Sequence, residues 1–140
     1  EGFLAIPRML LTNISLRSLC VVNNGIDDDD LALLAQALSE NKNLPLETLR
    51  LSFNEITCVG VEHLMNSIWG SPTLRELKLD NNKIQDRGAQ LCAVVLTSIP
   101  LEILDLSLNG ITTMGIKALM KNLSENTSLR SLGLTGIMID

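Results

Sequence analysis

The chain has 140 residues, of which 46% are hydrophobic and only 2% aromatic, and its formal net charge is -5. That length suits a single domain, and the composition predicts an aliphatic core. An acidic chain with so few aromatic rings lacks both the basic footprint and the stacking platforms of nucleic-acid binders, so we expect no nucleic-acid partner. No apolar run reaches the roughly 18 residues that a membrane span needs, so we expect no membrane partner.

An internal repeat runs through the chain, and we number its members from a leading leucine at position zero. Apolar residues recur at positions three, five and ten, an asparagine at eight, a glycine at fourteen, and apolar residues again at eighteen and twenty-two. Full repeats occupy residues 16–45, 46–73, 74–100 and 101–128, and partial repeats occupy 1–15 and 129–140. Two members depart from the pattern, because Asp30 replaces the glycine and Ile137 replaces the asparagine.

Each repeat changes its hydrophobic period once. The front half alternates, as at 49–51, which predicts a short strand with one buried face. The back half spaces its apolar residues at helical intervals, as at 61–68 and, in the first full repeat, 31–38. Segments 39–45 and 70–73 are expected to be joints. Because one such unit cannot bury its apolar face alone, the repeats are expected to stack, with parallel strands on one side and helices on the other.

Two positions that recur within the repeat have predicted structural roles. A buried asparagine amide at position eight can satisfy backbone groups left unpaired by the turn after each strand, in its own repeat and in the next. We therefore expect a ladder of Asn24, Asn54, Asn82 and Asn109. The glycine at position fourteen lies where the chain enters the helix, and it permits close approach or unusual dihedral angles. Pro7 falls inside the first helix, which we expect to be irregular.

The strand segments resemble those of the leucine-rich repeat family. The segments are LRSLCVVNNGI, LETLRLSFNEI, LRELKLDNNKI and LEILDLSLNGI. Repeats that start at Leu16, Leu46, Leu74, Leu101 and Leu129 are 30, 28, 27 and 28 residues apart, and with glycine at position fourteen they resemble the ribonuclease-inhibitor subclass. The resemblance covers essentially all of the chain. It implies an α/β solenoid that is curved, with parallel strands on the concave face and helices on the convex face.

The chain is expected to form a single leucine-rich-repeat domain over residues 1–140. It begins inside one repeat and ends inside another, and neither end has the polar surface of a cap. The sequence therefore predicts a fragment of a longer solenoid, or association through the uncapped ends.

The sequence lacks the residue combinations that catalysis and metal binding need. His63 is the only histidine, and no cysteine or carboxylate is spaced to join it, so we expect it on a helix surface. We expect Cys20 on the concave face, Cys58 in the convex turn and Cys92 in the core. Three cysteines without a CxxC pair favour free thiols in a reducing compartment, here the cytoplasm. We expect no enzyme activity, no cofactor and no metal.

Two further features each allow two interpretations. The acidic run 27–30 supplies N-cap and first-turn carboxylates for the following helix, or forms a cation site or a patch for a basic partner. Trp69, which precedes the predicted C-cap Gly70, covers the helix end or is an exposed binding hot spot. We prefer the structural interpretation of both.

Side chains at positions two, four, six and seven are expected to point off the concave face, and they vary from repeat to repeat. The candidate partner-binding residues are the charged Arg50, Glu76, Lys78, Asp80 and Asp105 and the apolar Phe53, Ile103 and Leu108. A mixed patch with apolar anchors suits a protein partner. The simpler alternative is that alternate strand positions are polar only because they face solvent.

The predicted function is a non-catalytic protein–protein interaction module or scaffold that binds a protein partner through its concave face. The resemblance implies two alternatives. One is a GTPase-activating regulator similar to the Ran-activating proteins, whose acidic tail and additional repeats are not seen here. The other is the ligand-sensing repeat region of an intracellular immune receptor.

Overall fold

Strands and helices alternate along the chain, as the change of hydrophobic period predicts. The structure, a computed structural model, describes residues 2–139. In chain order the elements are the 3-10 turn η1 (Gly2–Leu4), α1 (Ala5–Leu10), β1 (Ser18–Cys20), α2 (Asp28–Glu40), β2 (Thr48–Arg50), α3 (Cys58–Ile68), β3 (Glu76–Lys78), α4 (Gln85–Val95), β4 (Ile103–Asp105), α5 (Thr113–Leu123) and β5 (Ser131–Gly133).

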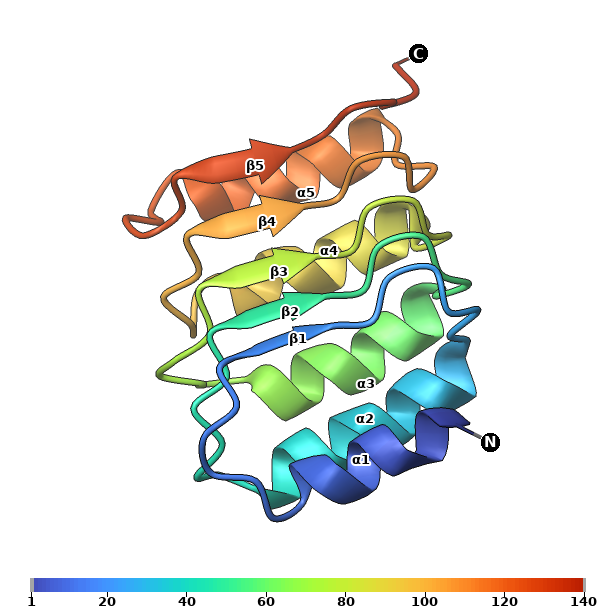
Figure 1. Cartoon of the computed structure of the whole chain (residues 1–140). Helices are drawn as coiled ribbons and strands as arrows, with labels where there is room; N and C mark the ends of the chain where they lie inside the picture. The colour runs from blue at the N-terminus through green and yellow to red at the C-terminus, as the bar shows by residue number, and fades with distance from the viewer. Residues whose placement is uncertain (1, 140) are drawn as a thin grey trace.

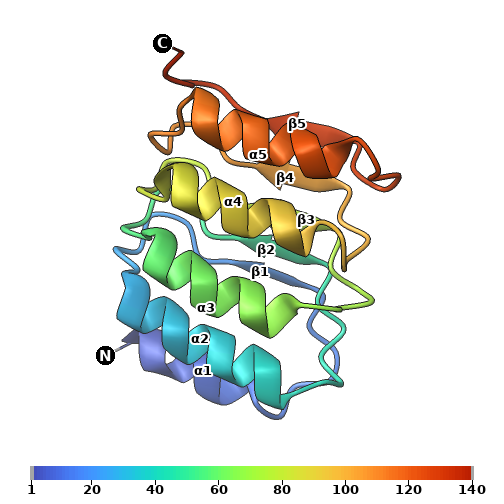
Figure 2. The same ribbon diagram turned by 180° about the vertical axis from the view of Figure 1, so that it is seen from behind.

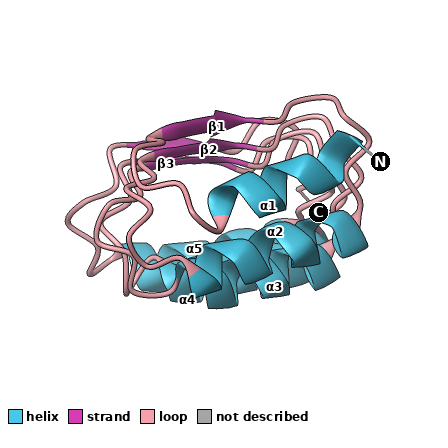
Figure 3. Ribbon diagram, turned by 60° about the horizontal axis from the view of Figure 1, so that its bottom comes forward, coloured by secondary structure: helices cyan, strands magenta, loops and turns pink. Residues whose placement is uncertain are grey.

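The strands form one parallel sheet in the order β1-β2-β3-β4-β5, and the helices form a second layer behind it (Figures 1 and 2). The position-three leucines lie side by side in register, from Leu19 in β1 to Leu132 in β5. The strands are stacked more closely than the helices, so the sheet lines the concave face (Figure 1). Loops on both flanks join the two layers (Figure 3). The predicted curved solenoid is therefore confirmed.

The space between the two layers is filled by aliphatic side chains from every repeat. Leu49, Leu77 and Leu104, at position three, are almost completely buried. The helical stripe is buried as well, as Val61 and Leu64 show in α3. Because these residues belong to one continuous cluster, each repeat gains its core only through its neighbours.

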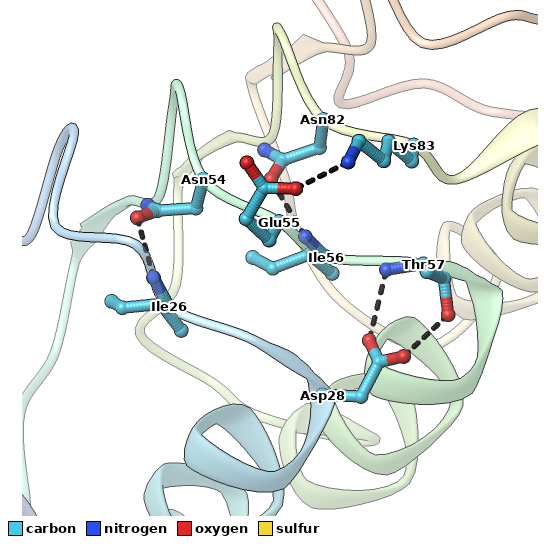
Figure 4. Close-up of polar contacts among 8 residues, drawn as sticks. All are labelled: Ile26, Asp28, Asn54, Glu55, Ile56, Thr57, Asn82 and Lys83. Atoms are coloured by element: carbon cyan, nitrogen blue, oxygen red, sulfur yellow. Dashed lines mark hydrogen bonds and ion pairs between the residues drawn. The ribbon is translucent and has the colours of Figure 1, made fainter.

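The asparagines at position eight form hydrogen bonds that connect each repeat to the one before it (Figure 4). The side-chain oxygen of Asn54 accepts from the N–H of Ile26 at 3.0 Å, and its amide donates to the carbonyl oxygens of Val21 and Leu51, both at 2.9 Å. All these groups are buried, so the amide satisfies backbone groups that water cannot reach.

The same pattern recurs at Asn82 and Asn109, which confirms the ladder over three repeats. Two details of the prediction are wrong. The bonds between repeats run to the preceding repeat and not to the next, because the amide donates to a carbonyl just after the preceding strand, such as Leu51 O. Asn24 is exposed and its amide donates only to Val22 O, because the described chain places no earlier strand turn beside it.

The glycines at position fourteen are needed for close approach. A Cβ on Gly60 would lie 2.5 Å from Oδ1 of Asp28, and one on Gly115 would lie 2.6 Å from Oδ1 of Asp86. Both glycines have ordinary helical backbone, so the alternative expectation of unusual dihedral angles is wrong. The glycine lets the start of one helix pack directly against an aspartate of the preceding helix.

Aspartates and threonines connect the starts of neighbouring helices in alternate repeats. Asp28 accepts from the N–H of Thr57 at 2.8 Å and from its hydroxyl at 2.5 Å (Figure 4). Asp86 accepts from the N–H of Thr112 at 2.7 Å and from its hydroxyl at 2.6 Å. We call each of these aspartate–threonine contacts a clamp. The two clamps lie two repeats apart, so this contact recurs in every second repeat.

Position one carries charges that alternate with the same two-repeat period. The residues are Arg17, Glu47, Arg75, Glu102 and Arg130. Arg17 pairs with Glu47 at 3.0 Å, and Arg130 lies 3.8 Å from Glu102. These pairs are exposed and stabilise little by themselves. They do place opposite charges on successive repeats.

Replacing Asp86 by asparagine is expected to flatten the acid dependence of stability. The hydroxyl of Thr112 is the main cause that lowers the pKa of Asp86 below its ordinary value, and the N–H groups of Thr112 and Gly115 add to it. Because the folded-state pKa is lower than the unfolded one, the ionised carboxylate stabilises the fold above about pH 4 and this contribution is lost as the pH falls through the folded-state pKa.

Urea unfolding at pH 7 and pH 3 measures this effect. The Asp86→Asn variant should be less stable than wild type at pH 7 and should lose less stability on acidification. Glu62→Gln, an exposed change on α3, is the matched control and should follow wild type at both pH values. An unchanged pH dependence in Asp86→Asn would contradict the clamp.

Both ends of α2 differ from expectation, and α1 accommodates a proline that was expected to make it irregular. Helix α2 begins at Asp28 rather than residue 31, because the Asp27 side chain accepts from the N–H of Asp30 and caps the helix early. It ends at Glu40, so the joint starts at residue 41 rather than 39. Pro7 is the third residue of α1, where its missing N–H needs no helical partner, and the short helix accommodates it.

Candidate functional site

The central charges of the concave face lie on neighbouring strands. Arg50 on β2 donates through Nε to Oε2 of Glu76 on β3 at 2.8 Å. The hydrogen bond and the charge of Glu76 raise the pKa of Arg50, which stays positive. The Arg50 side chain is 45% exposed and Glu76 only 13%. The pair therefore presents a fixed guanidinium to solvent.

Lys78 and Asp105 are partners in the register of β3 and β4. No ion pair joins the Lys78 ammonium to a carboxylate within 4.0 Å in residues 2–139. Asp105 accepts from the N–H of Ser107 at 3.0 Å, and its carboxylate lies over Gly133, where an added Cβ would be 2.2 Å from Oδ1. The Gly133 position therefore leaves room for the Asp105 side chain.

Asp80 lies just beyond the end of β3 and is held by two neighbours. Its carboxylate accepts from the hydroxyl of Ser52 at 2.5 Å and from the Asn81 amide at 3.0 Å. Ser52, at position six, is nearly buried, as is Ser107 in the equivalent place. These serines were expected to project from the concave face, and instead they support adjacent side chains and loops.

The three apolar candidates differ in setting. Ile103 is half-buried within β4. Phe53 and Leu108 follow β2 and β4 at position seven, and their exposed fractions are 54% and 50%. Both have positive φ, 57° and 54°, the left-handed region that bulky side chains seldom adopt. They stand at the edge of the sheet where the strands end.

The structure thus places five of the eight candidates on the strands, beside the buried leucines, and the other three in the loops that follow the strands. It brings four charged ones together on β2, β3 and β4, and it places Phe53 and Leu108 at the loop edge with Asp80. Sequence reasoning missed the left-handed backbone at position seven. The signal was present in Asn23, Asn81 and Gly136, residue types that favour this conformation.

The acidic run at 27–30 is used by the fold, as its preferred interpretation predicts. Asp27 and Asp30 form a reciprocal capping box, in which each side chain accepts from the backbone N–H of the other. Asp28 clamps Thr57 and also accepts from the N–H of Gly60 at 3.0 Å. Residues 2–139 contain no group of three or more histidine, cysteine or carboxylate side chains placed to hold a metal ion.

The potential nucleophiles and bases are separated from one another. His63 is exposed on α3, as expected. All three cysteines are free thiols: Cys20 is exposed beside Arg50, Cys58 begins α3, and Cys92 is buried. Burial raises the pKa of the Cys92 thiol to about 12, so it stays protonated. The arrangement offers surfaces and hydrogen bonds for binding.

Trp69 lies at the C-cap of α3 and is 53% exposed. Gly70, the predicted C-cap, instead lies one residue beyond it with φ 73°, the left-handed conformation in which glycine commonly follows a helix end. The indole lines a surface pocket of about 300 Å³ between the joints of two repeats, with Leu38 and Pro72 among the other lining residues. The Trp69 side chain is therefore exposed, and its role as a binding hot spot stays a prediction.

No helix among the described residues is both long enough and apolar enough to cross a bilayer.

Comparison with known proteins identifies related sequences. The family profile described as Leucine Rich repeat matches residues 12–35, 42–65, 70–91 and 97–120, more than half of the chain. The chain is 32% identical over 135 residues to NACHT, LRR and PYD domains-containing protein 5 from Homo sapiens, covering 91% of this chain and 11% of that protein. It is 30% identical over 131 residues to Ribonuclease inhibitor from Sus scrofa, covering 92% of this chain and 28% of that protein.

Among solved structures, the chain is similar to Leiomodin-1 Actin-Binding Site 2. The TM-score is 0.86 at 20% sequence identity, over 96% of this chain and 79% of that one, so the likeness is one of fold. The profile matches follow the stacked strand–helix units, and the similarity to the ribonuclease inhibitor covers 92% of this chain. The chain therefore belongs to the leucine-rich repeat family, in which it is ribonuclease-inhibitor-like.

Proposed function

We propose that this chain is a non-catalytic module that binds a protein partner through its concave face. The observation that carries the proposal is the contrast between an invariant scaffold and a variable sheet surface. Leucines and asparagines repeat in register, whereas the concave positions of β2, β3 and β4 hold Arg50, Glu76, Lys78 and Asp105. A rigid surface of mixed charge with apolar residues beside it is typical of protein recognition.

The related proteins support the same proposal. The names Ribonuclease inhibitor and Leiomodin-1 Actin-Binding Site 2 each state a protein partner of that protein. These names suggest ribonuclease and actin as the first purified proteins to test. The chain spans only 11% and 28% of the two sequence relatives, so whole-protein activities do not transfer from them.

The NACHT-containing relatives favour one specific alternative. In that alternative the concave face is the ligand-sensing part of a larger receptor, and the same concave residues bind the ligand. The GTPase-regulating alternative stays a prediction, and a GTP-hydrolysis assay with small GTPases tests it directly.

Reversing the charges of Arg50 and Asp105 together is expected to weaken partner binding by about tenfold or more. The double change Arg50→Glu and Asp105→Arg breaks the contact with Glu76 and inverts two exposed charges while leaving the buried core untouched. Surface plasmon resonance with the captured and purified partner measures the affinity, and circular dichroism checks the fold.

Glu62→Lys is the matched control, because Glu62 is exposed on the convex helix α3. It should leave binding unchanged. If Glu62→Lys abolishes binding while the double reversal does not affect it, the partner binds the convex face and the proposal is wrong.

A further inference from the structure

The residue at position seven has the same left-handed backbone conformation in each repeat from residue 16 onward. The residues there are Asn23, Phe53, Asn81, Leu108 and Gly136, and all have φ between 54° and 77°. The conformation is held by backbone hydrogen bonds to the following repeat, since Phe53 N–H donates to Asp80 O at 3.0 Å and Leu108 N–H donates to Thr135 O at 2.8 Å. Glycine and asparagine adopt it readily, whereas phenylalanine and leucine are strained in it.

Core packing does not explain the two strained residues. Phe53 and Leu108 are half exposed, while the leucines of the repeat scaffold are buried. Leu108 leans over Gly136, where an added Cβ would lie 2.5 Å from Cδ2, and still leaves half of its surface free. Large apolar side chains that are both strained and exposed indicate a role in contact with another molecule.

The spacing of the two residues selects a partner geometry. They follow β2 and β4, which are two strands apart, or about 9.6 Å at the usual spacing of parallel strands. Side chains at i and i+7 of an α-helix are about 10.5 Å apart on one face. A polyproline helix repeats at about 9.3 Å, but grooves that bind it are lined by aromatic rings, and Phe53 is the single ring here.

The charge that lies between Phe53 and Leu108 indicates which kind of side chain the partner presents there. Asp80 lies at position six beside Asn81, between Phe53 and Leu108, and its carboxylate is partly exposed. Lys78 is two residues further back, inside β3, and Lys83 on the other side pairs with Glu55. The nearest charge at the midpoint is therefore negative, which favours a cationic side chain.

We propose that Phe53 and Leu108 are the anchors for an amphipathic helix of the partner that lies across the strands, with apolar side chains at i and i+7 and a lysine or arginine at i+3 or i+4 facing Asp80. The proposal rests on the proposed function of the concave face and specifies its partner. The chain retains Phe53 and Leu108 at a cost in stability, because both are held in the left-handed backbone.

Stability is the first test, and it needs no partner. The double variant Phe53→Asn, Leu108→Asn should unfold at a urea midpoint equal to or above that of wild type, because asparagine fits the left-handed backbone. The reciprocal control Asn23→Leu introduces the same strain at an exposed position-seven residue and should lower the midpoint. A double variant with a lower midpoint than wild type, or an Asn23→Leu variant with an unchanged one, would overturn the claim of strain.

Binding of a designed peptide is the second test. The probe is a fluorescein-labelled, alanine-rich helix of about 18 residues, with leucine at i and i+7 and lysine at i+3 and i+4. Fluorescence anisotropy should show binding to wild type and at least tenfold weaker binding to the double asparagine variant. Asp80→Asn should weaken binding of this peptide but not of one with glutamine in place of lysine.

Two control peptides test the geometry. One places the leucines at i and i+5, and the other is proline-rich with leucines at i and i+3. If wild type binds either control as tightly as the probe, or binds none of them, the helix proposal is wrong. If the natural partner is weakened by the Arg50 and Asp105 reversal but not by the double asparagine variant, the concave-face function stands and the anchor proposal alone fails.

Discussion

Replacing Asn82 by alanine is expected to lower the free energy of unfolding by about 1–3 kcal/mol. The Asn82 side chain is buried between two repeats, where its oxygen accepts from Ile56 N–H and its amide donates to the carbonyl oxygens of Leu51 and Leu79. Alanine leaves these buried backbone groups without partners, and the space is too enclosed for bulk water to replace the amide. Equilibrium unfolding in urea measures the change.

Asn24→Ala is the matched control, because Asn24 occupies the same place in its repeat. Its side chain is exposed and donates only to Val22 O, so the substitution should change stability by less than about 0.5 kcal/mol. Equal losses in the two variants would show that the asparagine acts within its own turn, and the account of the ladder between repeats would fail.

Replacing Leu77 by alanine is expected to have the largest effect, a loss of about 2–5 kcal/mol. Leu77 is 1% exposed and lies in register between Leu49 on β2 and Leu104 on β4. The substitution removes contacts with both neighbours and leaves a cavity in the middle of the stack. Because each repeat depends on its neighbours, the two halves of the solenoid should also unfold less cooperatively.

Leu132→Ala tests the same position at the end of the sheet. Leu132 on β5 pairs only with Leu104 and is partly exposed, so its truncation should cost clearly less than that of Leu77. Hydrogen exchange resolves where the protection is lost, which should be on both sides of β3 in the Leu77 variant. A smaller loss for Leu77 than for Leu132 would contradict the continuous core.

The sequence predicts the scaffold well because the scaffold is set by short-range patterns. Leucines that alternate and then recur at helical spacing specify a strand and a helix, and repetition then specifies the stack. Asn54, Asn82 and Asn109 have the predicted role because each has a repeat before it. Asn24 has the same sequence context, yet its role differs, since a neighbour in space and not in sequence supplies the partners.

Features that depend on two repeats at once were missed. Asp28 and Asp86 recur two repeats apart, as do their partners Thr57 and Thr112, but a comparison of single repeats hides this period. The strain at position seven was missed for another reason. Asn23, Asn81 and Gly136 carry the sequence signal, but Phe53 and Leu108 are not residues that mark a left-handed turn, so the strain at these two is seen in the backbone. The partner-binding role of the concave residues stays a prediction, because it depends on a molecule outside the chain.

The position-one charges and the aspartate–threonine contacts both recur every second repeat. A pair of adjacent repeats is therefore the smallest unit that can be added or removed without mismatching them. Deleting residues 74–100 alone would set Glu47 beside Glu102 and leave Thr112 facing Cys58, with no carboxylate to hold it. Deleting residues 46–100 would instead set Arg17 beside Glu102 and Asp28 beside Thr112, which restores both contacts. Insertion or deletion of two adjacent repeats would therefore preserve the charge pairs and the aspartate–threonine contacts. Insertion or deletion of a single repeat would leave one junction without them.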